Sequence, residues 1–312
     1  MSIVGKAVAV LSRGGLVAFP TETVYGLGAD ARRSSGVQKI FRAKGRPATN
    51  PLIVHVEGKE SARRFTTVWP RNADILADAF WPGPLTLVLP KRNLIVSDAT
   101  AGRSTVGLRA PNHPLALELL KAFDGPIAAP SANRSNYLSP TTAEHVRAEL
   151  GDAVDLILDG GPCQVGIEST VLDLSEDRPM ILRPGSVTRE QIESLIGSVE
   201  MFCGSIDATI AAASPGQQER HYAPRTPAFR FEGSPPGEEH AGLVLIGESL
   251  HRRNAGCFEM PAEPAEYAKH LYAVLRELDE MRLPAIYIQM PPDLPEWAAV
   301  RDRIIRATSQ SK

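Results

Sequence analysis

Cysteine is scarce in this chain of 312 residues. The three cysteines are Cys163, Cys203 and Cys257, and no two of them form a C-x-x-C pair. This spacing argues against a disulfide framework and against a zinc knuckle. A thiol content this low is typical of a reducing compartment, so we expect a cytoplasmic protein.

Long apolar runs are also missing. No stretch of the sequence approaches the roughly 18 consecutive apolar residues that a membrane-spanning helix needs. In the N-terminal segment MSIVGKAVAVLSRGG the apolar part is short, Arg13 follows that part, and no cleavage site of small residues is evident. It therefore predicts an amphipathic helix rather than a signal peptide, and we expect no membrane partner.

A strong charge of either sign is absent as well, because the formal net charge is -2. Attraction of the whole surface to nucleic acid or to an anionic membrane is therefore not expected, and DNA is not an expected partner, although a local basic patch stays open. The composition, 43% hydrophobic and 22% charged, is that of a globular protein, and the length suggests two domains.

Several catalytic signatures are missing too. The chain has no G-x-x-x-x-G-K-[ST] phosphate loop, no H-E-x-x-H and no G-x-S-x-G. Gly26-Leu27-Gly28 begins like a dinucleotide-binding fingerprint but lacks its third glycine, so it is weak evidence.

The first two-thirds of the chain alternate short apolar runs with amphipathic runs, which predicts an α/β domain without fixing its strand order. One predicted helix has Val37, Ile40 and Phe41 on one face and ends at Gly45. Further helices are predicted over 114–123, from the Thr141/Glu144 pair and from the Thr188/Gln191 pair, both at capping-box spacing. The predicted strands are Leu16–Phe19, Leu52–Val56, Leu85–Leu89, Ile127–Ala129, Leu156–Leu158 and Thr170–Leu174.

The pattern lapses between residues 201 and 227, where small and turn-forming residues dominate, as in a linker or a functional loop. After it come two predicted strands, Leu243–Ile246 and Ala285–Gln289, and two predicted helices, Glu263–Met281 and Glu296–Ala307. Their alternating order suggests a small, doubly wound α/β domain.

Polar clusters follow several of the predicted strands. PTETVYGLGAD (20–30) offers threonine hydroxyls and glycines that let a ligand approach the backbone, although a tight turn would use the same residues. KGRPATNPLIVH (44–55) combines Lys44, Arg46, Asn50 and His55. Each could be structural alone, as a helix-end cation or a core histidine, but together they suit a phosphate or a carboxylate.

Further polar groups lie beyond later strands, where α/β folds bind ligands. Arg109 suits a carboxylate, or else a surface salt bridge. PIAAPSANRSNYLSP (126–140) holds more hydroxyl and amide groups than a plain connector needs, although caps and turns could use most of them. GIESTV (166–171) and LRPG (182–185) add Glu168, Ser169 and Arg183.

Taken in order, these blocks together with FWPGPLTLVLP and SPG…HYAP resemble the threonylcarbamoyl-AMP synthase family in its long, two-domain Sua5 form. The resemblance implies a YrdC-like, twisted open-sheet catalytic domain over 1–200, a linker over 201–227 that acts as an active-site lid, and a small Rossmann-like α/β domain of the Sua5 type over 228–312. The last part resembles the family only by its position and β/α pattern.

The resemblance implies an L-threonylcarbamoyladenylate synthase, a nucleotidyltransferase that uses L-threonine, CO2 or bicarbonate, and ATP, and releases pyrophosphate. Its product serves the t6A37 modification of tRNA together with separate transferase proteins. Mg²⁺ is expected to enter with ATP and to keep most of its waters, so no carboxylate cage on the protein is expected.

The family pattern assigns a role to each matching position. It places Lys44 and Arg46 in the catalytic set. Threonine would be held by Thr23, His55, Arg109, Ala129 and Ser169. ATP would be held by Arg46, Asn50, Thr105, Ser131, Asn133, Ser139, Arg183 and Tyr222. Gln217, Gln218 and Glu219 depart from the basic residue that the family often has in the linker.

Two other interpretations use the same residues. One is a YrdC-like module that binds tRNA or double-stranded RNA without turnover, against which the net charge argues. The other is an O-carbamoyltransferase or a hydrogenase-maturation relative, but those proteins carry zinc-finger cysteines or extra domains that this chain lacks.

Overall fold

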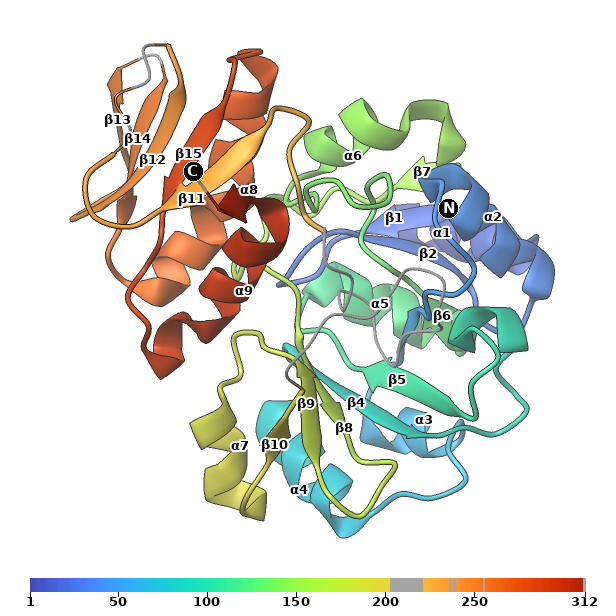
Figure 1. Ribbon diagram of the computed structural model, residues 1–312. Coiled ribbons are helices and arrows are strands. Elements are labelled where there is room, and N and C mark those ends of the chain that lie inside the picture. The colour runs from blue at the N-terminus through green and yellow to red at the C-terminus, as the bar shows by residue number, and fades with distance from the viewer. Residues whose placement is uncertain (203–220, 236, 238–239, 255, 311–312) are drawn as a thin grey trace.

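The computed structural model describes residues 1–202, 221–235, 237, 240–254 and 256–310, and these form two α/β units (Figure 1). The larger unit is built on a ten-stranded mixed sheet and the smaller one on a six-stranded sheet. The sequence-based α/β prediction, with a large open sheet followed by a small Rossmann-like unit, is confirmed.

The large sheet places its functional edge where β3, β5 and β9 end. β3 pairs with β5 in parallel, β5 with β4 antiparallel, β4 with β8 in parallel and β8 with β9 antiparallel, so β3, β5 and β9 run in the same direction. In spatial order the strands are β10 (Glu200–Met201), β9 (Met180–Arg183), β8 (Thr170–Asp173), β4 (Leu85–Pro90), β5 (Thr105–Arg109), β3 (Ile53–His55), β6 (Ile127–Ala128), β2 (Gly26–Asp30), β1 (Val17–Phe19) and β7 (Leu156–Ile157).

Helices pack around this sheet with the faces that the sequence predicts. Val37, Ile40 and Phe41 are buried on α2, and the helix ends at Gly45, whose φ of 59° is the left-handed conformation that favours glycine. The helices of this unit are α1 (Ile3–Ser12), α2 (Ser34–Lys44), α3 (Lys59–Arg63), α4 (Arg71–Phe80), α5 (Pro114–Phe123), α6 (Ala143–Leu150) and α7 (Arg189–Ile196), with 3₁₀ turns η1 (Ser97–Thr100) and η2 (Gly151–Ala153).

The sequence predicts the capping residue of α7 correctly and places that of α6 one residue too early. The Thr188 capping box with Gln191 is present at the start of α7. At α6 the capping residue is Thr142 rather than Thr141, because the Thr142 hydroxyl accepts the hydrogen bond from the His145 N–H. Several strands were also missed, among them β2, a wholly buried GLGAD segment whose glycines hide the usual strand pattern.

The small unit carries both of its helices on one face of its sheet. α8 (Pro264–Glu280) and α9 (Ala298–Ala307) pack with Val244, Phe258 and Ile288, whereas Phe231 and Tyr287 belong to a separate cluster on the other face. The sequence suggested helices on both faces of this sheet, and that prediction is wrong because α8 and α9 cover the same face. In spatial order its strands are β13 (His251–Asn254), β14 (Cys257–Pro261), β12 (Gly242–Gly247), β15 (Ile286–Gln289), β11 (Ala228–Phe231) and β16 (Ser309–Gln310), and η3 (Pro295–Trp297) precedes α9.

The two units share one apolar core. Val24, Leu138 and Ile167 of the large unit cluster with buried residues of α8 and α9, such as Leu271 and Val300. Figure 1 shows α8 and α9 on the side of the small sheet that faces the large unit. Burial of this shared surface removes apolar area from water and so stabilises the docked arrangement.

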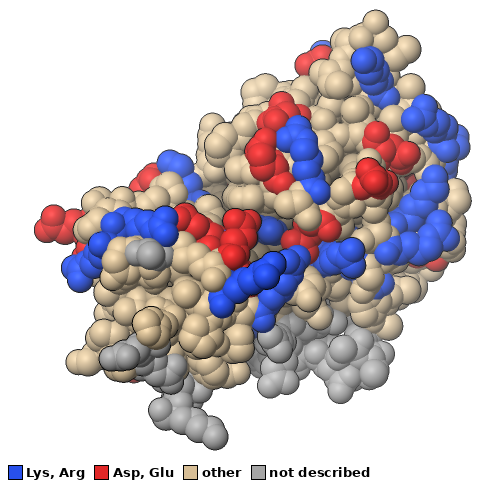
Figure 2. Space-filling view, turned by 90° about the horizontal axis from the view of Figure 1, so that it is seen from above, with Lys and Arg blue, Asp and Glu red and all other residues tan. Residues whose placement is uncertain are grey.

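Charge on the molecular surface is mixed. On the face seen in Figure 2, Lys and Arg side chains lie among Asp and Glu side chains. Each helix of the described residues is too short or too polar to cross a lipid bilayer. Most of the predicted lid, residues 203–220, lies outside the described residues, and so does Cys203.

Gly166 offers a test of how the units dock. A Cβ at this position would come within 2.5 Å of the Lys269 Cα and 2.6 Å of the Ala268 carbonyl oxygen on α8, and its φ is +79°. Gly197 has a similar φ of +84° but nothing within 4 Å of a Cβ. Gly166→Ala should lower the free energy of unfolding by about 1–3 kcal/mol more than Gly197→Ala, because only the former overpacks the junction. Equal losses in denaturant unfolding would contradict this.

Candidate active site

A pocket opens at the edge where β3, β5 and β9 end, and it gathers most of the residues singled out in the sequence. His55 and Arg109 are the last residues of β3 and β5 and stand opposite each other in register. Arg183 ends β9, and Ser169 directly precedes β8. Of the predicted residues, the pocket is lined by Thr23, Arg46, His55, Arg109, Ala129, Ser131, Ser169, Arg183 and Tyr222.

Five predicted residues do not line this pocket. Thr105 begins β5 whereas Arg109 ends it, and four residue-to-residue steps along the strand separate their Cα atoms by about 13 Å. Their predicted contacts with substrate stay predictions. The five are Lys44, Asn50, Thr105, Asn133 and Ser139.

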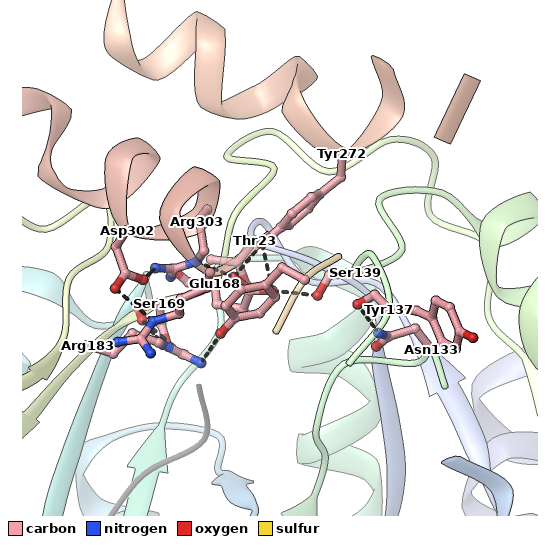
Figure 3. Close-up of polar contacts among 12 residues, drawn as sticks. Thr23, Asn133, Tyr137, Ser139, Glu168, Ser169, Arg183, Tyr272, Asp302 and Arg303 are labelled. Carbon is pink, nitrogen blue, oxygen red and sulfur yellow. Dashed lines mark hydrogen bonds and ion pairs between the residues drawn. The ribbon is translucent and has the colours of Figure 1, made fainter. Parts of the chain in front are cut away.

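Lys44 ties down the loop that carries Ser131. Its buried ammonium donates to the Ser131 carbonyl at 2.6 Å, to the Asn133 carbonyl at 2.5 Å and to Asn133 Oδ1 at 3.3 Å. These contacts use the three donors of an ammonium group. Asn133 in turn donates to the carbonyl of Tyr137 (Figure 3) and to that of Arg134. Burial, and then the neighbouring Arg46, lower the pKa of Lys44 well below its usual value. The geometry gives Lys44 a positioning role.

Arg109 is held by three different groups. Its Nε donates to the Gly83 carbonyl at 3.2 Å and its Nη1 to the Thr23 hydroxyl at 2.9 Å, while Nη2 lies 2.7 Å from Glu22 Oε1. Both side chains of the ion pair are almost wholly buried. Glu22 was missed in the sequence, where it lies between two threonines that were noticed for their hydroxyls. Only the fold shows that it neutralises Arg109.

His55 is a neutral group inside the pocket. Burial and the adjacent Arg109 lower its pKa to about 3. Its Nδ1 is buried and has no hydrogen-bond partner within the described part of the chain. A neutral imidazole with an unused nitrogen can bind a polar ligand without adding charge.

The nucleotide side predicted from the sequence contains two further guanidinium groups. Arg183 donates from Nε and Nη2 to the Ser169 carbonyl at 3.1 and 3.0 Å, and from Nη1 to the Tyr222 hydroxyl at 3.4 Å. Arg46 donates to the Pro51 carbonyl at 3.2 Å, and its buried Nε lacks a partner among the described residues. Burial lowers the pKa of Arg46 to about 10, so it remains a cation at neutral pH.

The buried imidazole of His221 lies near several cations at the pocket. This buried imidazole lines the pocket, and its pKa is well below the usual value. The causes are burial first, and then the charges of Arg46, Lys44 and Arg183. The positive charges that oppose protonation of this imidazole also favour the binding of an anion.

Among the described residues that line the pocket, Glu168 is the one acidic side chain, and the partners of its carboxylate are hydrogen-bond donors. Its carboxylate accepts from the Ser139 hydroxyl at 2.5 Å, from the Tyr272 hydroxyl at 3.1 Å and from Arg303 Nε at 2.7 Å (Figure 3). Burial by itself raises the pKa of Glu168, but Arg303, Arg183 and Ser139 together lower it below its usual value. Tyr272 and Arg303 lie on helices of the small unit that carry no motif, so sequence analysis missed them.

Two family models match the chain in succession. Residues 9–185 match a model described as telomere recombination, which covers the Sua5, YciO and YrdC proteins, and residues 187–309 match the C-terminal domain of threonylcarbamoyl-AMP synthase. The chain belongs to the threonylcarbamoyl-AMP synthase family. The family predicted from the sequence motifs is therefore confirmed.

Relatives of this family match along nearly the whole chain. The threonylcarbamoyl-AMP synthase of Bacillus subtilis is 41% identical, over 97% of this chain and 92% of that protein. The structure of Pyrococcus abyssi Sua5 complexed with L-threonine has a TM-score of 0.90 at 37% identity, over 97% of this chain and 93% of that one. Escherichia coli YciO, at 24% identity and a TM-score of 0.53 over 59% of this chain, shares the fold of the larger unit.

The depressed pKa of His55 predicts a pH dependence. The unfolded chain binds a proton at His55 near pH 6.5, whereas the folded chain does so only near pH 3. Between these values the unfolded state holds more protons, so this contribution to stability is full above pH 6.5 and is lost as the pH falls. From pH 6.5 to pH 5, the wild type should lose up to about 1.4 kcal/mol per pH unit more than His55→Gln. Parallel curves of unfolding free energy against pH would show that His55 is not a buried neutral group.

Proposed function

We propose that this chain is an L-threonylcarbamoyladenylate synthase, which forms threonylcarbamoyl-AMP and pyrophosphate from L-threonine, CO2 or bicarbonate, and ATP. The observation that carries the proposal is the convergence of Arg46, Arg109 and Arg183 in one buried pocket. Membership of the family and the likeness to a Sua5 structure with L-threonine bound support it.

We assign the β5 end of the pocket to threonine. Arg109, fixed by Gly83, Glu22 and Thr23, presents a guanidinium whose position is set in advance, which favours a carboxylate ligand. Because Glu22 already neutralises Arg109, this pair contributes orientation more than net charge. His55, Ala129 and Ser169 line the same pocket and complete the predicted set.

We assign the β9 end to ATP. Arg46 has no carboxylate within ion-pair distance in the described residues, so its charge is available to a phosphate. Arg183, Ser131 and Tyr222 line the pocket with it. Lys44 holds the loop that carries Ser131 through hydrogen bonds to Ser131 and Asn133. Its predicted direct role in catalysis remains a proposal. The same is true of the ATP contacts predicted for Asn50, Thr105, Asn133 and Ser139.

The chemistry needs positioning more than a side-chain nucleophile. The threonine nitrogen bonds to the carbon of CO2 and loses a proton, which gives a carbamate. A carbamate oxygen then bonds to the α-phosphorus while the bond to the bridging oxygen of the β-phosphate breaks and pyrophosphate leaves. Guanidinium groups fixed before the reaction stabilise the charge on the phosphate oxygens. A pocket shielded from water also protects the labile carbamate.

Mg²⁺ is proposed to enter as part of the ATP substrate. Within the described residues, no group of three or more His, Cys, Asp or Glu side chains is arranged to hold a metal ion. Glu168 is engaged by Arg303, Ser139 and Tyr272. An ion that keeps most of its waters and is bound through phosphate oxygens fits this donor set.

Substrate entry requires the pocket to widen. Its cavity volume is about 50 Å³, far below the roughly 300–1,000 Å³ of typical ligand sites. His221 and Tyr222, which belong to the 201–227 linker, line this pocket, so their displacement would enlarge it. The transferase proteins and tRNA that would use the product belong to the same proposal.

Formation of the adenylate tests the proposed function. Incubation of the chain with L-threonine, bicarbonate, ATP and Mg²⁺ should yield threonylcarbamoyl-AMP by mass spectrometry, with pyrophosphate released only when threonine and bicarbonate are both present. Omission of each substrate is the control. Tight, salt-sensitive tRNA binding without any adenylate would instead support the RNA-binding interpretation.

The two ends of the pocket should respond differently to conservative substitutions. A lysine at 109 cannot keep all three contacts of the guanidinium, so Arg109→Lys should raise the KM for threonine about tenfold and that for ATP far less. Arg183→Lys should do the reverse. Steady-state kinetics with each substrate varied in turn would decide, and equal effects of either variant on both KM values would contradict the assignment.

A further inference from the structure

The small unit inserts one wholly buried arginine against the pocket. Arg303, on α9, has a relative exposure of 0%. Its Nε donates to Glu168 Oε2 at 2.7 Å, its Nη2 to the Glu168 carbonyl at 3.3 Å and its Nη1 to Asp302 at 2.6 Å. Figure 3 shows this guanidinium beside Glu168, with Tyr272 entering from the neighbouring helix. Arg303 therefore holds both the side chain and the backbone of a pocket residue.

These contacts continue to the predicted ATP-binding side chains. The residue after Glu168 is Ser169, whose carbonyl and hydroxyl accept hydrogen bonds from Arg183. The guanidinium carbon of Arg303 also lies 5.1 Å from the ring centroid of Tyr222, and the Tyr222 hydroxyl accepts from Arg183. Tyr222 has a φ of +60°, a conformation that non-glycine residues seldom adopt without support from their surroundings. Arg303 thus supports Tyr222 and, through Glu168, Arg183.

Charge gives Arg303 a second effect. Glu168 lines the pocket that we assign to the triphosphate, and a bare carboxylate there would repel it. Arg303 neutralises that carboxylate. Asp302 forms ion pairs with both Arg303 and Arg306. The carboxylates of Glu168 and Asp302 are therefore neutralised before the nucleotide arrives.

We propose that Arg303 is a positioning residue through which the small unit sets the affinity of the pocket for ATP, by neutralising Glu168 and supporting Tyr222. This role deepens the proposed function and rests on it. It differs from a simple tie between the units, because a tie would act on folding and on both substrates alike.

Variants at Arg303 and a matched arginine test the proposal. Arg303→Met removes the charge and keeps apolar bulk. Arg303→Lys keeps the charge but loses the planar guanidinium that faces Tyr222. Arg303→Met combined with Glu168→Gln leaves no unpaired carboxylate and so guards against loss of folding. The control is Arg301→Met on the same helix, because Arg301 contacts Asp293 and the Pro291 carbonyl within the small unit.

The expected readout is a split between the two KM values. Arg303→Met should raise the KM for ATP about tenfold, equivalent to about 1.4 kcal/mol, with the KM for threonine within about twofold of wild type. Arg303→Lys should raise the KM for ATP about threefold, and the double variant should recover at least about threefold of the loss in Arg303→Met. Arg301→Met should leave both values unchanged.

Other outcomes overturn the proposal. These are an unchanged KM for ATP in Arg303→Met, equal rises for both substrates, or a double variant no better than the single one. If Arg303→Met does not fold, wild-type KM values for ATP in both Arg303→Lys and the double variant overturn it as well. Calorimetric titration of each variant with ATP alone separates the two proposals. A wild-type chain that binds ATP but forms no adenylate contradicts the proposed function and leaves the proposal for Arg303 to the titrations of its variants.

Discussion

Three guanidinium groups are held out of contact with bulk water at one edge of the large sheet, and most other features of the pocket follow from the cost of burying them. Each is compensated differently. Arg109 is paired with Glu22, Arg183 is held by the Ser169 carbonyl and Tyr222, and Arg46 keeps a carbonyl contact and an unpaired Nε. Burial of an uncompensated charge is expensive, so the least compensated cation marks where an anionic ligand would contribute most.

The same cost explains the neutral histidines. His55 and His221 are both buried beside cations, and in each case burial and the neighbouring positive charge act in the same direction to lower the pKa. Neither side chain adds positive charge to a region that already holds several cations. Both keep an Nδ1 without a hydrogen-bond partner among the described residues, so they offer polar atoms that a substrate could use.

The junction between the units connects packing with chemistry. A shared apolar core holds α8 and α9 against the large unit, and Gly166 permits the close approach of α8 because it has no side chain. That packing brings Tyr272 and Arg303 to Glu168. The small unit therefore contributes part of the electrostatic environment of the pocket, although none of the described residues from 228 onward lines the pocket itself.

The sequence by itself determined the local structure and the family. Helix faces, the end of α2 at Gly45 and the Thr188 capping box follow from nearest neighbours along the chain. The motifs identify the family because their residue types and their order along the chain match the family pattern.

Only the tertiary structure decided which of these residues meet. Lys44 was expected to contact phosphate, yet its three donors are used by the Ser131–Asn133 loop, and Thr105 lies at the opposite end of the strand from Arg109. Glu22, Tyr272 and Arg303 gain their importance from partners 87, 104 and 135 positions away along the chain. Charge compensation over such separations depends on the docking of strands and helices, which no local pattern in the sequence encodes.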